Sequence, residues 1–278
     1  MTNHHKSQFP IHDWDLAYDN RGYVPNIEKL IGDLPEKAAD YRSKSNCKLN
    51  ISYGATERMV YDLFMPENTP IGLMVFIHGG YWHLTDKSVW SHLAKGAVDS
   101  GWAVILPSYE LCPNVKIADI TAMLGNAINQ AAQNIEGPIV LSGHSAGGHL
   151  VCEMMSEGSP LGDDVITRLK KVVSISGLCD LRPLLNTKMN DVLDLDINSA
   201  TAASPALKVP LKNIPLVAWV GAAERAEFLR QNALIANIWH GLGVDITIVE
   251  EPDKQHFSVV ESMRDQNSAL VNALLDIG

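Results

Sequence analysis

Short runs of consecutive apolar residues alternate along the chain with longer stretches in which apolar residues recur at helical spacing. The continuous runs predict buried strands and fall at residues 73–77, 102–106, 138–141, 169–175, 214–220 and 245–249. The stretches with helical spacing fall at residues 86–100, 116–135, 225–240 and 259–277. Buried strands that alternate with helices are typical of a sheet covered on both faces. We therefore predict an α/β fold with a mostly parallel central sheet flanked by helices.

The N-terminal part of the chain departs from this alternation. Residues 1–25 are polar with scattered aromatic residues, which favours an arm lying over the domain. Helical spacing predicts a helix over residues 25–41 that Pro35 can break. Residues 48–53 and 59–65 alternate between apolar and polar positions, which predicts two antiparallel strands at the start of the sheet.

Residues 177–213 are too long for an ordinary connection between two strands. We interpret this segment as a small lid over the functional site rather than a second domain. A surface excursion with minor helices of its own is the alternative. The prediction is therefore a single domain over residues 1–278.

Composition narrows the class of protein. A chain that is 46 % hydrophobic and 19 % charged is ordinary for a globular protein with a sizeable core. A net charge of −10 argues against a nucleic-acid partner. No apolar run approaches the ~18 residues that span a bilayer, and the polar start of the chain predicts a cytoplasmic protein without a membrane partner. The cysteines, which predict free thiols rather than a zinc site, are Cys47, Cys112, Cys152 and Cys179.

The sequence G-H-S-A-G at residues 143–147 is the most informative motif. It follows the apolar run 139–141 and precedes a helical stretch at 146–157. The nucleophile elbow of the α/β-hydrolases needs this strand–turn–helix setting, with small residues where the backbone turns back on itself. The pentapeptide alone also occurs by chance, so its meaning depends on partners elsewhere. We interpret Ser145 as a nucleophile.

A serine hydroxyl needs a general base, and the base needs a carboxylate that fixes its tautomer. In α/β-hydrolases the histidine follows the last strand of the sheet. His256 has this position, and we predict it as the base. His240 falls instead at the end of a predicted helix, where a histidine usually interacts with the free carbonyls.

The acid of such a triad is expected just after the penultimate strand. Glu224 is the first carboxylate there, and we predict it as the acid. Asp180, after the preceding strand, is a second candidate, and Asp253 is a weaker one because it shares the histidine's loop. Glu227 is expected on the following helix, where its side chain points elsewhere.

The third predicted strand ends in H-G-G-Y-W at residues 78–82. Acyl transfer needs backbone donors for the developing oxyanion, one after the nucleophile and others in the loop that follows this strand. The predicted donors are the N–H groups of Gly80, Tyr81 and Ala146. The predicted pocket residues are Tyr81, Trp82 and His144, although the aromatic residues could equally be packing. His78 is expected to hold the loop by hydrogen bonds.

With H-G-G-Y-W at 78–82, G-H-S-A-G-G-H-L at 143–150 and H-F at 256–257, the chain resembles the serine-type kynurenine formamidases (arylformamidases). These are α/β-hydrolases close to the carboxylesterases. Y-D-N-R at 18–21 extends the resemblance over nearly the whole chain. It implies hydrolysis of N-formyl-L-kynurenine to kynurenine and formate, in tryptophan breakdown, without a metal or other cofactor. The departure is Glu224, where the family usually has aspartate.

We therefore predict a serine hydrolase that cleaves an aryl formamide through an acyl-enzyme. A carboxylesterase for short-chain esters is the alternative, because the same groups cleave both bonds. A hydrolase fold that only binds ligands is disfavoured because candidates for all three triad members are present. Dimers are common in the family that the chain resembles, so a homodimer stays open.

Overall fold

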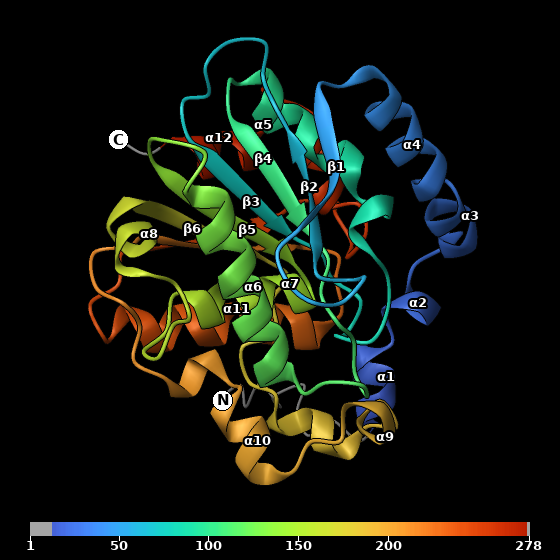
Figure 1. The fold of residues 1–278 in the computed structure, drawn as a ribbon. Helices are drawn as coiled ribbons and strands as arrows, with labels where there is room; N and C mark the ends of the chain where they lie inside the picture. The colour runs from blue at the N-terminus through green and yellow to red at the C-terminus, as the bar shows by residue number, and fades with distance from the viewer. Residues whose placement is uncertain (1–12, 277–278) are drawn as a thin grey trace, which may run out of the picture.

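The computed structural model describes residues 13–276 and contains a central eight-stranded sheet with helices on both faces (Figure 1). The strands are β1 Cys47–Ser52, β2 Val60–Phe64, β3 Leu73–Ile77, β4 Ala103–Pro107, β5 Ile139–His144, β6 Leu169–Ile175, β7 Leu216–Gly221 and β8 Ile246–Glu251. Their order is β1-β2-β4-β3-β5-β6-β7-β8. Strands β3 to β8 pair in parallel, while β2 pairs antiparallel with both β1 and β4. The predicted α/β fold with a mostly parallel sheet is confirmed.

Both faces of the sheet are buried, which explains the continuous apolar runs. In β3 all five residues are buried. Leu73, Val75 and Ile77 belong to the core on one face, and Met74 and Phe76 to the core on the other. Because successive side chains of a strand point to opposite faces, a strand covered on both sides needs apolar residues at every position.

Helices from separate parts of the chain cover the two faces (Figure 1). The first face is covered by α6 Ile117–Ala132, α7 Ala146–Met154 and α11 Ala226–His240, with α8 Asp163–Arg168 beside them. The second face is covered by the short helices η1 Lys87–Val89, η2 Ser91–Ala94, α5 Lys95–Asp99, η5 Val260–Arg264 and α12 Ala269–Leu275. The helices predicted at 116–135 and 225–240 are therefore confirmed.

Two other predicted helices are broken into shorter pieces. The stretch 86–100 is interrupted at Trp90, whose φ of −114° and ψ of 1° end η1 before η2 begins. The stretch 259–277 is interrupted at Asp265, which is extended and accepts a hydrogen bond from the Asn267 N–H at 2.9 Å. Such a side-chain turn competes with helical hydrogen bonding, which is why the helix does not continue.

The N-terminal part contains α1 Trp14–Tyr18, α2 Asn20–Tyr23, α3 Ile27–Gly32 and α4 Leu34–Lys44. The single helix predicted over 25–41 is thus two helices. Pro35 lies in the first turn of α4, where a missing N–H costs no hydrogen bond, so it helps to begin a helix. The part of the predicted arm at 1–12 lies outside the described residues.

The segment 177–213 contains η3 Arg182–Asn186, α9 Asn190–Leu193, α10 Ile197–Ala202 and η4 Pro205–Leu207. Its buried leucines join the core of the first face; they are Leu178, Leu181, Leu184 and Leu193. Figure 1 shows α9 and α10 at the same end of the molecule as α1, and the Lys188 N–H donates to Asp15 at 2.7 Å. The interpretation as a lid stays a prediction.

Within residues 13–276, no helix has both the length and the apolar character that crossing a membrane requires.

Candidate active site

Ser145 lies at the sharp turn between β5 and α7. Its φ of 57° and ψ of −117° form a conformation that a residue with a side chain rarely adopts. The flanking glycines are required by close backbone contacts. A Cβ on Gly143 would lie 2.2 Å from the Gly147 carbonyl oxygen, and one on Gly147 would lie 2.0 Å from the Ile77 carbonyl oxygen. The G-x-S-x-G sequence therefore coincides with the turn geometry of a nucleophile elbow.

The loop after β3 lies directly against this serine. A Cβ on Gly79 would lie 2.9 Å from the Cβ of Ser145, so only glycine allows the approach. The next three residues of the loop all have positive φ, namely Gly80 at 112°, Tyr81 at 48° and Trp82 at 59°. The loop approaches Ser145 at Gly79, and the first residue of α7 follows Ser145 directly. The assignment of individual oxyanion donors stays a prediction.

His78 begins this loop and is held beneath it, as expected. Its Nδ1 lies 3.1 Å from the Thr85 hydroxyl, and its ring stacks on the Tyr109 ring at 4.4 Å between centroids. His78 is almost fully buried, so it supports the loop from within the core.

His256 and Glu224 form a buried hydrogen-bonded pair. The Nδ1 atom of His256 lies 2.6 Å from Oε2 of Glu224. The other carboxylate oxygen accepts hydrogen bonds from the Ser176 hydroxyl at 2.6 Å and the Gly221 N–H at 2.9 Å. Because Glu224 occupies Nδ1, Nε2 is the ring nitrogen that can take a proton from a nucleophile. The arrangement has the chemistry of a triad base oriented by its acid.

His144 is hydrogen-bonded to the loop that contains His256. Its Nε2 donates to the His256 carbonyl oxygen at 2.8 Å, and the centroids of the His144 and His256 rings lie 4.6 Å apart. Phe228 packs on His256 at the same centroid distance of 4.6 Å. His144 is 2 % exposed. Its assignment to the substrate pocket stays a prediction.

The alternative acids have other partners. Asp180 pairs with Arg182, each of its oxygens 2.9 Å from a guanidinium nitrogen. Glu227 lies on α11, as expected, where its carboxylate accepts a hydrogen bond from the Tyr18 hydroxyl at 2.7 Å and pairs with Arg230 at 2.6 Å. The remaining alternatives, Asp253 and His240, are exposed. Of the carboxylates considered from the sequence, only Glu224 contacts the histidine.

Trp82 and Tyr81 have different surroundings. Trp82 is fully buried, and its indole N–H donates to Nδ1 of His149 at 3.2 Å. This contact fits the packing role that the sequence left open, and the role of Trp82 as a pocket wall stays a prediction. Tyr81 is half-buried and its hydroxyl donates to the Tyr18 carbonyl oxygen.

Sequence reasoning missed Ser176 and His149. Ser176 follows β6 as Glu224 follows β7, so its position at the carboxyl end of a strand was a usable signal. His149 accepts from Trp82 and donates through Nε2 to the Ala203 carbonyl oxygen at 2.8 Å. It thus joins the loop after β3, helix α7 and the segment 177–213, a long-range contact that no local pattern indicates.

The buried histidines predict a loss of stability in mild acid. Burial lowers the pKa of His78 to about 4, that of His149 to about 3, and that of His144 well below its usual value. Between pH 7 and 5 the unfolded chain therefore binds protons on these histidines that the folded chain does not, and the folded state loses stability. The expected loss is on the order of 2 kcal/mol each for His78 and His149, and His144 adds to it in the same direction.

Urea unfolding at pH 7 and pH 5 measures this loss. The matched control is His240→Gln, which changes an exposed histidine and should keep the same pH dependence. An equal free energy of unfolding at both pH values would contradict the buried neutral state of these rings.

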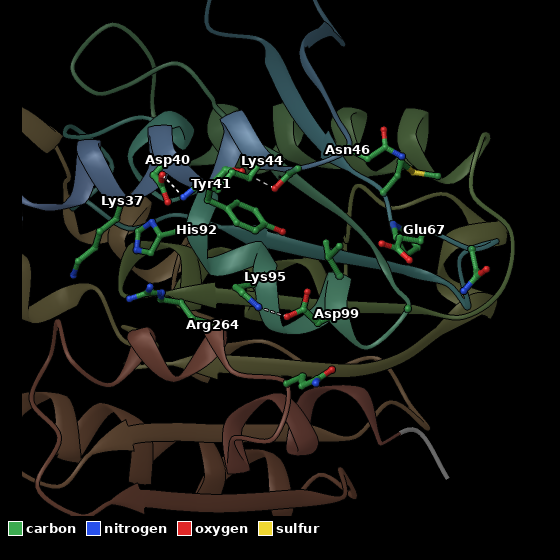
Figure 2. A pocket seen from close by; sticks show the side chains of 17 residues that line it. Lys37, Asp40, Tyr41, Lys44, Asn46, Glu67, His92, Lys95, Asp99 and Arg264 are labelled. Atoms are coloured by element: carbon green, nitrogen blue, oxygen red, sulfur yellow. Dashed lines mark hydrogen bonds and ion pairs between the residues drawn. The ribbon is translucent and has the colours of Figure 1, made fainter.

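A surface cavity of about 940 Å³ lies elsewhere, between α4, α5 and η5 (Figure 2). None of the predicted site residues lines it. Charged side chains in its wall pair with each other, as Lys44 does with Asp40 and Lys95 with Asp99. It is therefore not the candidate active site. Within the described part of the chain, no group of three or more histidine, cysteine, aspartate or glutamate side chains could hold a metal ion.

Comparisons with known proteins show similarity to kynurenine formamidases and to a proposed thioesterase. The family model BD-FAE matches residues 61–209. The kynurenine formamidase of Danio rerio is 27 % identical over 245 residues, which cover 84 % of this chain and 83 % of that protein. The kynurenine formamidase of Salmo salar is 27 % identical and covers 90 % and 88 % of the two chains. A solved structure of a proposed thioesterase from Silicibacter sp. TM1040 superimposes with a TM-score of 0.90 at 44 % identity, covering 94 % of this chain and 98 % of that one.

Proposed function

The chain belongs to the BD-FAE family, within the α/β-hydrolase esterases, and on this basis we propose that it is a serine hydrolase that cleaves an aryl formamide through an acyl-enzyme. The observation that carries the proposal is the buried pair of His256 and Glu224, 2.6 Å apart, in a loop that is hydrogen-bonded to His144, the residue before the serine at the strained strand–helix turn. The likeness to the kynurenine formamidases, at 27 % identity, supports the formamide as substrate and N-formyl-L-kynurenine as its first example.

Acylation begins when the Ser145 oxygen attacks the formyl carbon and Nε2 of His256 takes the hydroxyl proton. The carbonyl oxygen becomes an oxyanion that accepts hydrogen bonds from the N–H groups of Gly80, Tyr81 and Ala146. Glu224 holds the N–H of Nδ1 and stabilises the imidazolium. The carbon–nitrogen bond then breaks, the leaving amine receives the proton from His256, and a formyl ester remains on the serine.

Deacylation repeats these steps with water. The water oxygen attacks the formyl ester while His256 takes a proton from that water. The same N–H groups bind the second oxyanion. The ester bond breaks, the proton returns to the Ser145 oxygen, and formate leaves. The products are one aryl amine and one formate for each water consumed, so the enzyme needs no redox or metal chemistry for its balance.

Hydrolysis of esters or thioesters is the second candidate. The 44 % identical protein from Silicibacter sp. TM1040 is a proposed thioesterase, which favours an oxygen or sulfur leaving group. The same nucleophile, base and donors serve either bond, so the choice depends on the leaving-group side of the pocket. The half-buried Tyr81 is the aromatic residue of the loop after β3 that an aryl leaving group can contact.

A substrate panel distinguishes the two candidates. We expect kcat/KM for N-formyl-L-kynurenine to exceed that for p-nitrophenyl acetate and an acetyl thioester by about 10- to 100-fold, the range over which pocket contacts discriminate between substrates. The measurement is initial-rate kinetics on all three substrates with one enzyme preparation. A preference for the ester or thioester would contradict the formamide as substrate but not the proposal of a serine hydrolase. Inactivity on all three would contradict the proposed function itself.

A further inference from the structure

The segment formed by α1 and α2, Trp14–Tyr18 and Asn20–Tyr23, is tied to the loop after β3. The Tyr81 hydroxyl donates to the Tyr18 carbonyl oxygen, and the side-chain amide of Asn20 lies 3.3 Å from the same hydroxyl. A tyrosine hydroxyl has one proton, and Tyr18 receives it, so Asn20 must donate through its NH₂ group. The Tyr81 hydroxyl is therefore held by two groups of the N-terminal segment.

This segment is itself fixed to helix α11. The Tyr18 hydroxyl donates to Glu227 at 2.7 Å and accepts from the Gln231 side chain at 3.3 Å. Arg230 pairs with Glu227 at 2.6 Å, which fixes the position of that carboxylate. Burial and the neighbouring Glu227 raise the pKa of Tyr18, so its hydroxyl keeps the proton that it donates. Tyr18 is 2 % exposed, so this anchor lies in the interior.

Helix α11 also contacts the catalytic histidine. Phe228 of α11 contacts both Tyr18 and His256, with its ring centroid 6.2 Å from that of Tyr18 and 4.6 Å from that of His256. One helix thus provides the anchor of the N-terminal segment and a packing surface for the base. The loop after β3 and the His256 loop are held against a common support.

The backbone at Tyr81 needs such support. Its φ of 48° and the φ of 59° at Trp82 place two successive residues with side chains in the left-handed region. Strained backbone of this kind persists only where the surroundings determine it. Trp82 is fixed by His149 and by the Cys112 N–H, which donates to its carbonyl oxygen at 2.9 Å. For Tyr81, the ties to Tyr18 and Asn20 provide the corresponding support.

We propose that Tyr18 and Asn20 are positioning residues that hold Tyr81 in the backbone conformation that binds the oxyanion. The N-terminal segment is then a working part of the active site. This inference rests on the proposed function, because it assigns an oxyanion donor to Tyr81. A donor that binds charge developing in the transition state affects kcat more than KM.

The test is Tyr81→Phe, which keeps the ring and the backbone N–H group and removes only the hydroxyl that ties them to the N-terminal segment. We expect kcat to fall by about 10- to 100-fold, less than the ~10²- to 10³-fold effect of losing a whole oxyanion donor. KM should change by less than about twofold, as expected for an interaction made only in the transition state. Asn20→Ala, which removes the second tie, should lower kcat in the same direction. Phenylboronic acid, which forms a tetrahedral adduct with an active serine, should bind Tyr81→Phe more weakly by the same factor as kcat falls.

The matched control is Tyr53→Phe. Tyr53 is also buried, and its hydroxyl donates to the Ser108 carbonyl oxygen, outside the loop after β3. This variant should lose a comparable amount of thermal stability and keep both kcat and the affinity for the boronic acid.

Each outcome has one meaning. Wild-type kcat and boronic-acid affinity in Tyr81→Phe would overturn the positioning role but would not contradict the proposed function as a serine hydrolase. An equal loss in Tyr53→Phe would also overturn it, because the effect would then be general destabilisation. A wild-type enzyme that is inactive on formamide, ester and thioester substrates would instead contradict the proposed function.

Discussion

Replacement of Ser145 by alanine is expected to lower kcat by about 10⁵- to 10⁶-fold, as removal of the nucleophile does in other serine hydrolases. The loss is this large because His256 takes its proton from the serine hydroxyl, and without that hydroxyl no acyl-enzyme can form. The oxyanion donors and the binding contacts remain, so a small residual rate above that of water is expected. The measurement is kcat/KM for N-formyl-L-kynurenine, with the thermal midpoint of the same preparation.

The strand that precedes Ser145 offers a matched control for this variant. Ser142 is three residues earlier on β5 and fully buried, and its hydroxyl has no hydrogen-bond partner within residues 13–276. Ser142→Ala should keep activity within a few-fold of wild type, because it removes a serine oxygen without touching the elbow. Activity of Ser145→Ala at the level of Ser142→Ala would contradict the nucleophile. If the wild type hydrolyses nothing and both variants bind a ligand equally, the chain is a binding protein on a hydrolase fold.

The sheet was predictable because its physical requirement is local. A strand with helices on both faces needs consecutive apolar residues, and β3 and β5 are buried at every position. The breaks in the helices were not predictable in the same way. Trp90 interrupts a helical pattern because its buried ring packs near His144, with the centroids 6.2 Å apart. Tertiary contacts of this kind override local spacing, which is only a weak constraint.

For the candidate site too, the residues that follow strands were predictable and the contacts between distant side chains were not. Ser145, Glu224 and His256 each follow a strand, and the carboxyl ends of parallel strands meet at one edge of the sheet, so their order along the chain predicted their neighbourhood. The supporting contacts depend on side chains that meet only in the folded chain. His144 holds the His256 loop and Trp82 is held by His149, and neither contact was indicated by the sequence. A single sequence carries the spacing of the strands but not the directions of these rings.

The acid is expected to show the second-largest effect, because Glu224→Gln should force His256 into the wrong tautomer. One oxygen of Glu224 accepts from Ser176 and from the Gly221 N–H, so a glutamine must keep its carbonyl oxygen there. Its NH₂ group then faces Nδ1 of His256, which can only accept. The ring proton moves to Nε2, the atom that must take the serine proton. We expect kcat to fall by about 10³- to 10⁴-fold, the size of effect that a tautomer change has on a triad.

Two further variants make this expectation specific to Glu224. Asp180→Asn should keep activity within a few-fold, because Asp180 pairs with Arg182 and does not contact His256. Glu224→Asp keeps the charge but is one methylene shorter, so it cannot keep both the Gly221 contact and the 2.6 Å contact to His256. Its kcat should therefore lie between those of the wild type and Glu224→Gln. Near-wild-type activity of Glu224→Gln together with an inactive Asp180→Asn would reverse the assignment of the acid. Equal losses in Glu224→Asp and Glu224→Gln would show that reach, not tautomer, determines the rate, because only the glutamine changes which ring nitrogen carries the proton.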